Sequence, residues 1–101
     1  MKAKHVISIK DLSVDDIEEI FDLAKKLKAE GKFARAESLK GKTLGLIFQK
    51  PSLRTKVSFA VAMAQLGGTA IYLAPEEVKL GEREAIKDVA RTLSRYLDGI
   101  V

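Results

Sequence analysis

A short apolar run that leads directly into an amphipathic helix is the feature that most limits how this chain can fold. Residues 43–48 are almost continuously apolar, which is typical of strands that are covered on both faces of a parallel sheet. A helix is predicted to follow over residues 52–66. Because a parallel neighbour is reached through a crossover of this kind, the stretch predicts a β-α-β unit.

The remaining sequence continues this alternation. A first helix is predicted to begin at Ser13, in a capping box with Asp16, and to stop at Gly31. Gly67 and Gly68 lack the Gly-x-Gly-x-x-Gly spacing of a dinucleotide site and are expected to end the second helix. The other predicted elements are a second strand at 70–73, a loop at 75–82, a third helix at 83–97 and a third strand from 99.

This order predicts an α/β fold. Right-handed crossovers would give a three-layer αβα domain with a parallel sheet and helices on both faces. At 101 residues the chain has the length of one domain. Its last residues, from Gly99 to Val101, are apolar and strand-like, so the fold is expected to be truncated at the third strand.

The composition excludes several functions. The formal net charge is +4, but the basic residues are dispersed among fourteen acidic ones, so no nucleic-acid partner is expected. There is no cysteine and His5 is the single histidine, which argues against disulfides, a thiolate metal site and a Ser-His-Asp triad. No apolar run approaches the length of a membrane span, so no membrane partner and a cytoplasmic location are expected.

The start of the second predicted helix has the chemistry of an anion site. Helix N-termini present unpaired N–H groups and a partial positive charge. Here they are joined by the hydroxyls of Ser52 and Thr55 and the guanidinium of Arg54, which suit a phosphate group. The alternative is that Ser52 is an ordinary helix cap followed by solvated side chains.

Two blocks of the sequence resemble the aspartate/ornithine carbamoyltransferase family. The first resembles its carbamoyl-phosphate signature, usually Ser-Thr-Arg-Thr-Arg, with Leu53 for the first Thr and Lys56 for the last Arg. Lys56 keeps the charge but lacks the fork of arginine. The second, residues 81–101, resembles the ornithine branch, because Arg83-Glu84 stands where the aspartate branch tends to have Lys-Gly-Glu-Ser. The first block is Phe48-Gln49-Lys50-Pro51-Ser52-Leu53-Arg54-Thr55-Lys56, with Val57-Ser58-Phe59 and Leu66-Gly67-Gly68 after it.

The resemblance implies roles for individual residues. Ser52, the backbone of Leu53 and Arg54, and Thr55 would hold carbamoyl phosphate. Arg54 and Thr55 would also be catalytic, Arg54 by neutralising charge on the departing phosphate and Thr55 by donating to the carbonyl oxygen. Lys79 stands where the ornithine branch often has a glutamine that reaches carbamoyl phosphate in a neighbouring subunit. The alternative for Lys79 is a solvated loop lysine.

The resemblance also implies the reaction and its setting. The ornithine branch transfers a carbamoyl group from carbamoyl phosphate to the ornithine δ-amine, giving citrulline and phosphate in arginine biosynthesis, without a metal or organic cofactor. Its members are homotrimers with active sites between subunits. Residues 1–101 would be the carbamoyl-phosphate-binding domain, an N-terminal fragment of a longer two-domain enzyme. Ornithine would be bound by the missing second domain, so the fragment is expected to be inactive alone. The alternatives are a fragment of an aspartate carbamoyltransferase catalytic chain and a non-catalytic anion-binding module.

Overall fold

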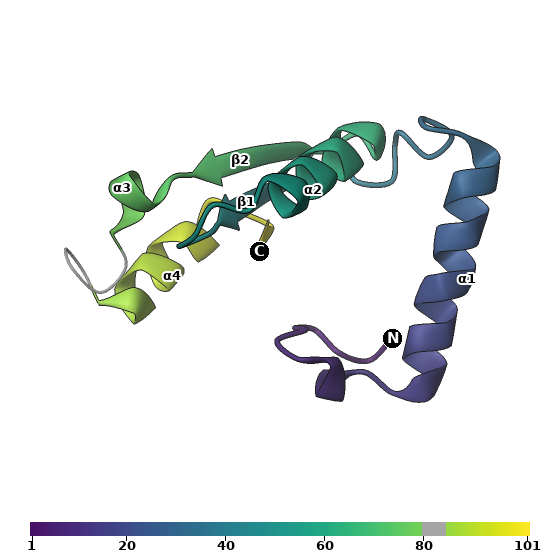
Figure 1. The fold of residues 1–101 in the computed structure, drawn as a ribbon, viewed down its shortest axis with the longest axis horizontal. Coiled ribbons are helices and arrows are strands. Elements are labelled where there is room, and N and C mark those ends of the chain that lie inside the picture. Colours follow the sequence, from purple (N-terminus) through teal and green to yellow (C-terminus); the bar gives the residue numbers. More distant parts are fainter. Residues whose placement is uncertain (80–84) are drawn as a thin grey trace. The chain divides into compact units, whose positions relative to one another are not determined.

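The computed structural model describes residues 1–79 and 85–101 (Figure 1). The chain divides into two compact units, Met1–Ala34 and Arg35–Val101, which are described separately. The first unit contains the short 3₁₀ helix η1 (Ile9–Asp11) and α1 (Val14–Glu30). The second unit contains β1 (Thr43–Ile47), α2 (Leu53–Gln65), β2 (Thr69–Leu73), α3 (Pro75–Val78), α4 (Ile86–Ser94) and β3 (Gly99–Ile100).

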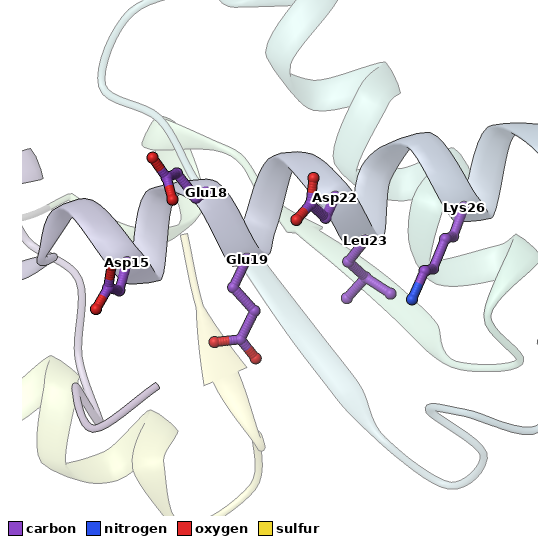
Figure 2. A pocket seen from close by; sticks show the side chains of 6 residues that line it. All are labelled: Asp15, Glu18, Glu19, Asp22, Leu23 and Lys26. Carbon is purple, nitrogen blue, oxygen red and sulfur yellow. The ribbon is translucent and has the colours of Figure 1, made fainter.

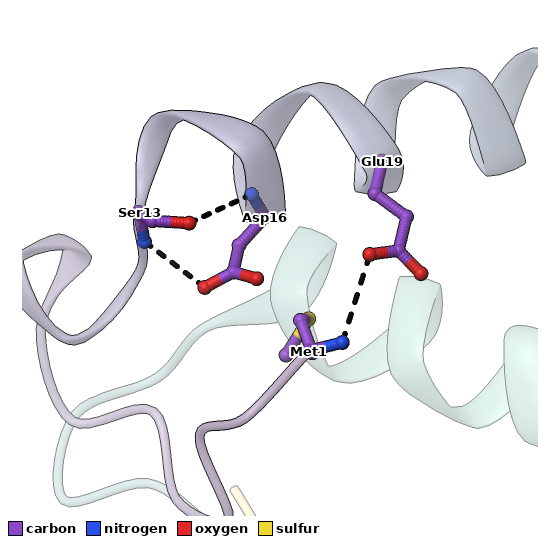
Figure 3. Close-up of polar contacts among 4 residues, drawn as sticks. All are labelled: Met1, Ser13, Asp16 and Glu19. Carbon is purple, nitrogen blue, oxygen red and sulfur yellow. Dashed lines mark hydrogen bonds and ion pairs between the residues drawn. The ribbon is translucent and has the colours of Figure 1, made fainter.

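Helix α1 starts with the predicted capping box. The Asp16 amide donates to the Ser13 hydroxyl at 3.0 Å, and the Ser13 amide donates to the Asp16 carboxylate, also at 3.0 Å. Figure 3 shows this pair beside the ion pair of the Met1 amino group with Glu19, at 3.6 Å. At the other end the helix stops at Gly31, as predicted, where φ is +102°.

The second unit is built on a three-stranded parallel sheet in the order β2-β1-β3. From β1 the chain moves to one neighbour and then back to the other side, so right-handed crossovers place α2 and α4 on opposite faces of the sheet. The buried residues Leu46, Met63 and Val89 come from the central strand and from these two helices. The predicted α/β fold with a parallel sheet is therefore confirmed.

The end of the sheet explains why α4 is shorter than predicted. Asp98 accepts a hydrogen bond from the Thr43 amide at 2.8 Å through its carboxylate, and its own amide donates to the Thr43 carbonyl at 2.9 Å. These bonds tie the start of β3 to the start of β1. Residues 95–96 accordingly form a turn, and the Leu97 amide after it donates to the Leu93 carbonyl at 2.9 Å.

The prediction of a loop from Pro75 was wrong for its first residues. Pro75–Val78 forms the single-turn helix α3, with proline at its start. Proline suits that position because its φ is already helical and its missing N–H would have had no partner inside the helix. The rest of the predicted loop, from residue 80 to Glu82, and the Arg83-Glu84 start predicted for the third helix lie outside the described residues.

Helix α2 ends in the predicted glycine cap, which is a Schellman motif. The Gly68 amide donates to the Met63 carbonyl at 2.8 Å and the Gly67 amide to the Ala64 carbonyl at 3.2 Å. Gly67 has a φ of +86°, and a Cβ added there would collide with the Ala36 carbonyl oxygen. Gly67 is therefore required both by its backbone conformation and by a close backbone neighbour.

We expect Gly67→Ala to destabilise the protein much more than Gly41→Ala. Both glycines have positive φ, but nothing lies within 4 Å of a Cβ built on Gly41. Gly41→Ala should therefore lose only about 1–2 kcal/mol, the strain of a left-handed alanine. Gly67→Ala adds the collision with Ala36 and should lose about 3 kcal/mol or more. Urea unfolding measures both, and equal losses would contradict the close approach.

The cap of α1 should be lost at low pH. The hydrogen bond from the Ser13 amide lowers the pKa of the Asp16 carboxyl below its ordinary value of 3.8. Its stabilising contribution is therefore complete above the unfolded value and is lost as the pH falls through the lowered pKa. In an NMR titration, the Ser13 amide proton should shift as Asp16 is protonated. The same signal should stay still in Asp16→Asn, and a shift that persists there would contradict the assignment.

Candidate anion-binding site

The candidate site lies at the end of the sheet where β1 and β2 both finish. A pocket of about 340 Å³ opens there, lined by the last residue of β1 and by residues that follow the two strands. Open α/β sheets bind ligands at this carboxyl edge. The lining residues are Ile47, Phe48, Gln49, Pro75, Glu76, Val78 and Lys79.

Ser52 occupies the N-cap position of α2, but its side chain does not cap the helix. Its side chain forms no capping hydrogen bond, and its φ and ψ are −143° and 71°. Its carbonyl accepts the first helical hydrogen bond, from the Lys56 amide, at 2.9 Å. The interpretation of Ser52 as an ordinary side-chain cap was therefore wrong, and its hydroxyl is left for another partner.

The first turn of α2 keeps its donors unused within the part of the chain that the structure describes. No residue in 1–79 or 85–101 accepts a hydrogen bond from the amides of Leu53, Arg54 or Thr55, as expected at a helix start. In the same residues Arg54 forms no ion pair, and its side chain is exposed. Among the described residues, the turn therefore combines three amides and one hydroxyl without a hydrogen-bond partner with one cation that has no ion-pair partner.

The charges in this turn run against the helix dipole. The first turn of α1 contains Asp15 and Asp16, whereas the first turn of α2 contains no acidic residue. Arg54 and Lys56 stand there instead. Cations are unfavourable at the positive end of a helix. Such an unfavourable placement of cations is expected at a binding site, because a bound anion would be attracted both by the cations and by the helix N-terminus.

Lys56 is engaged by an aromatic ring. Its Nζ lies 3.8 Å from the ring centroid of Tyr72 on β2, which is a cation–π contact. The same ring lies 6.5 Å from that of Phe48, with the planes tilted by 35°. Tyr72 was missed in the sequence analysis, because its neighbours Phe48 and Lys56 are brought to it by the pairing of β2 with β1.

Lys79 lies in the pocket at the strand ends, near Gln49. It ends α3 in the left-handed conformation, with φ at 44°, and its amide donates to the Pro75 carbonyl at 2.8 Å. The residues lining that pocket do not include Ser52, Leu53, Arg54 or Thr55. The structure thus places the predicted residues in two parts, the α2 turn and the Lys79 pocket.

A larger hollow of about 440 Å³ lies on α1 (Figure 2). All six of its lining residues belong to that helix, and four of them are acids, so the hollow would repel an anion. One helix face also cannot surround a ligand. Among the described residues no three His, Cys, Asp or Glu side chains are placed so that they could hold one metal ion, and the acids of this hollow are no exception. The lining residues are Asp15, Glu18, Glu19, Asp22, Leu23 and Lys26.

Comparison with known proteins shows the family. The fold and the turn define an α/β domain with a candidate anion site at the carboxyl edge of its sheet. Residues 4–101 match the family described as aspartate/ornithine carbamoyltransferase, carbamoyl-P binding domain. The chain therefore belongs to the aspartate/ornithine carbamoyltransferase family, as the sequence resemblance indicated.

Individual relatives point to the ornithine branch. An ornithine carbamoyltransferase of Methanopyrus kandleri is 49% identical over 105 residues, which cover 100% of this chain and 33% of that protein. The crystal structure of the Thermus thermophilus ornithine carbamoyltransferase matches with a TM-score of 0.88 and 43% identity, over 99% of this chain and 34% of that one. The catalytic subunit of M. jannaschii aspartate transcarbamoylase matches with a TM-score of 0.83 and 37% sequence identity, over 97% of this chain and 33% of that one.

The chain thus spans about one third of the length of these relatives. None of the helices in residues 1–79 and 85–101 has the length and apolar character needed to cross a membrane.

We expect Ser13→Ala to weaken a helix cap and Ser52→Ala to weaken phosphate binding. Ser13→Ala removes a cap bond and should speed hydrogen exchange of the Asp16 amide about fivefold, the effect of losing a typical N-cap. Ser52→Ala removes no cap bond, so exchange at Lys56 should be unchanged, while inorganic phosphate should bind more weakly. Exchange by NMR and phosphate titration measure the two effects. Faster exchange at Lys56 in Ser52→Ala would show that Ser52 caps α2 after all.

Proposed function

We propose that this chain binds carbamoyl phosphate at the first turn of α2 and contributes that half of the active site of an ornithine carbamoyltransferase. The observation that carries the proposal is the set of unused donors in this turn. The Ser52 side chain makes no capping hydrogen bond. Among the described residues, the amides of residues 53–55 have no acceptor and Arg54 has no ion-pair partner. A phosphate group would satisfy all of them at once.

In the reaction, this turn would stabilise negative charge. The ornithine δ-amine attacks the carbamoyl carbon, a C–N bond forms, the bond to the phosphate oxygen breaks, and the amine loses a proton. Arg54 and the free amides would stabilise the charge that develops on the departing phosphate. The Thr55 hydroxyl would donate to the carbonyl oxygen. The products are citrulline and phosphate, in the direction of arginine biosynthesis, and neither step calls for a metal or an organic cofactor.

Residues outside this chain would complete the site. Ornithine would be bound by a second domain, which positions its amine against the carbamoyl carbon. Lys79 would contact the phosphate of carbamoyl phosphate held by a neighbouring subunit of a cytoplasmic homotrimer. Its exposed side chain at the edge of the Lys79 pocket suits such a contact, because an ammonium can reach a phosphate oxygen as a point charge.

An aspartate carbamoyltransferase is the second candidate. The match to the M. jannaschii aspartate transcarbamoylase subunit, with 37% identity, supports it, although the ornithine carbamoyltransferases named above are 43% and 49% identical. Both enzymes would use the α2 turn in the same way. The two candidates can be distinguished by assaying a protein that carries this chain together with the second domain. An ornithine carbamoyltransferase would form citrulline from ornithine, and an aspartate carbamoyltransferase would form carbamoyl aspartate from aspartate.

Phosphate binding should be confined to the α2 turn. In the 101-residue chain, inorganic phosphate or carbamoyl phosphate should shift the amide signals of residues 52–55. Arg54→Lys should weaken carbamoyl phosphate binding about tenfold or more, because an ammonium cannot replace the forked contact. Lys56→Ala should weaken it less.

The matched control is Arg91→Lys, an exposed arginine on α4, which should bind as the unchanged chain does. Unchanged binding in Arg54→Lys together with a clear loss in Lys56→Ala would show that general positive potential, and not the forked contact of Arg54, is responsible. Shifts at residues 91–95 with none at 52–55 would overturn the site.

A further inference from the structure

The ring of Tyr72 contacts both ends of the segment that forms the candidate phosphate turn. Phe48 comes directly before this segment, and its ring centroid lies 6.5 Å from that of Tyr72. Lys56 comes directly after it, and its ammonium lies 3.8 Å from the Tyr72 centroid. Residues 49–55 between them include the whole proposed binding turn. One side chain on β2 thereby contacts the residues on either side of a segment that leads from β1 into the first turn of α2.

The sheet puts Tyr72 in the right place for these contacts. Tyr72 pairs with Leu46 in the parallel register of β1 and β2, so it lies beside the last residues of β1. Its side chain is 37% exposed, whereas the core is formed by Leu46, Met63 and Val89. The ring is therefore not needed to fill the core. Its contacts are with the two flanking residues of the turn.

We propose that Tyr72 is a positioning residue for the phosphate-binding turn. Holding both ends of a loop lowers its conformational freedom, which otherwise has to be lost when a ligand binds. A turn whose donors are already in place binds an anion more tightly than one that must be ordered first. The consequence for binding rests on the proposed function, whereas the order of the turn does not.

The Lys56 contact defines the role of that lysine. Its ammonium is held over the Tyr72 ring, so Lys56 acts by securing the start of α2. Arginine would fill the same position, because a guanidinium also stacks on an aromatic ring. A lysine that instead contacts the phosphate directly would lose binding when its charge is removed, without any change in the order of the free turn.

The experiment compares Tyr72→Leu and Tyr72→Phe with the unchanged 101-residue chain. Tyr96→Leu is the matched control, because Tyr96 is 79% exposed. Hydrogen exchange is measured at the Lys56 amide, which donates to the Ser52 carbonyl, and phosphate affinity is measured by titration with inorganic phosphate. Urea unfolding gives the global stability of each variant.

Tyr72→Leu should speed exchange at Lys56 about five- to tenfold, from the loss of one aromatic and one cation–π contact. It should weaken phosphate binding by a similar factor, whereas Tyr96→Leu should change neither exchange at Lys56 nor phosphate affinity. Tyr72→Phe should behave as the unchanged chain, since the ring is kept. Unchanged exchange in Tyr72→Leu overturns the proposal, and so does faster exchange with unchanged phosphate affinity.

A second variant separates the two roles of Lys56. Lys56→Met should speed exchange at residue 56 in the absence of phosphate, and Lys56→Arg should restore it. Weaker binding in Lys56→Met with unchanged exchange would assign the lysine to direct ligand contact. If phosphate binds none of these proteins, the proposed function fails, and the exchange of the free chains still decides whether Tyr72 orders the turn.

Discussion

The parallel pairing of β1 with both of its neighbours is the constraint on which the rest of the second unit depends. Because all three strands run the same way, β1 and β2 finish at one edge of the sheet, and the segments after them meet there. This places the α2 turn and the α3 segment, which follow different strands, at the same edge of the sheet, where Tyr72 on β2 contacts Phe48 and Lys56. The bonds between Asp98 and Thr43 then fix the opposite end of the sheet, where β3 begins beside β1.

The sequence predicted the elements whose signals are local. Ser13 with Asp16 marks a helix start, Gly67 with Gly68 marks a helix end, and the apolar run of β1 marks a buried strand. The short helix α3 was missed because one turn is too short to show a helical period, and Pro75 was interpreted as the opening of a loop. Tyr72 was missed for another reason. Its partners, Phe48 and Lys56, are brought to it by strand register, which no local pattern contains.

The candidate site was predicted in its residues but not in its geometry. Ser52, Arg54 and Thr55 do lie at a helix start that follows a parallel strand. Lys79, however, belongs to a pocket that the residues of the turn do not line. Within the described residues the two parts are separate features of the same sheet edge. A role for Lys79 in a neighbouring subunit is consistent with that separation and stays a proposal.

Two serines that precede helices in this chain show how a structural cap differs from a binding group. Ser13 is followed three residues later by Asp16, whose carboxylate returns a hydrogen bond to the serine amide, so the pair satisfies itself. Ser52 is followed at the same distance by Thr55, which carries no carboxylate, and α2 has no acid in its first turn. The negative charge that α1 supplies from its own sequence is therefore missing from α2. A bound anion would supply that missing negative charge at the helix N-terminus, as the proposed function requires.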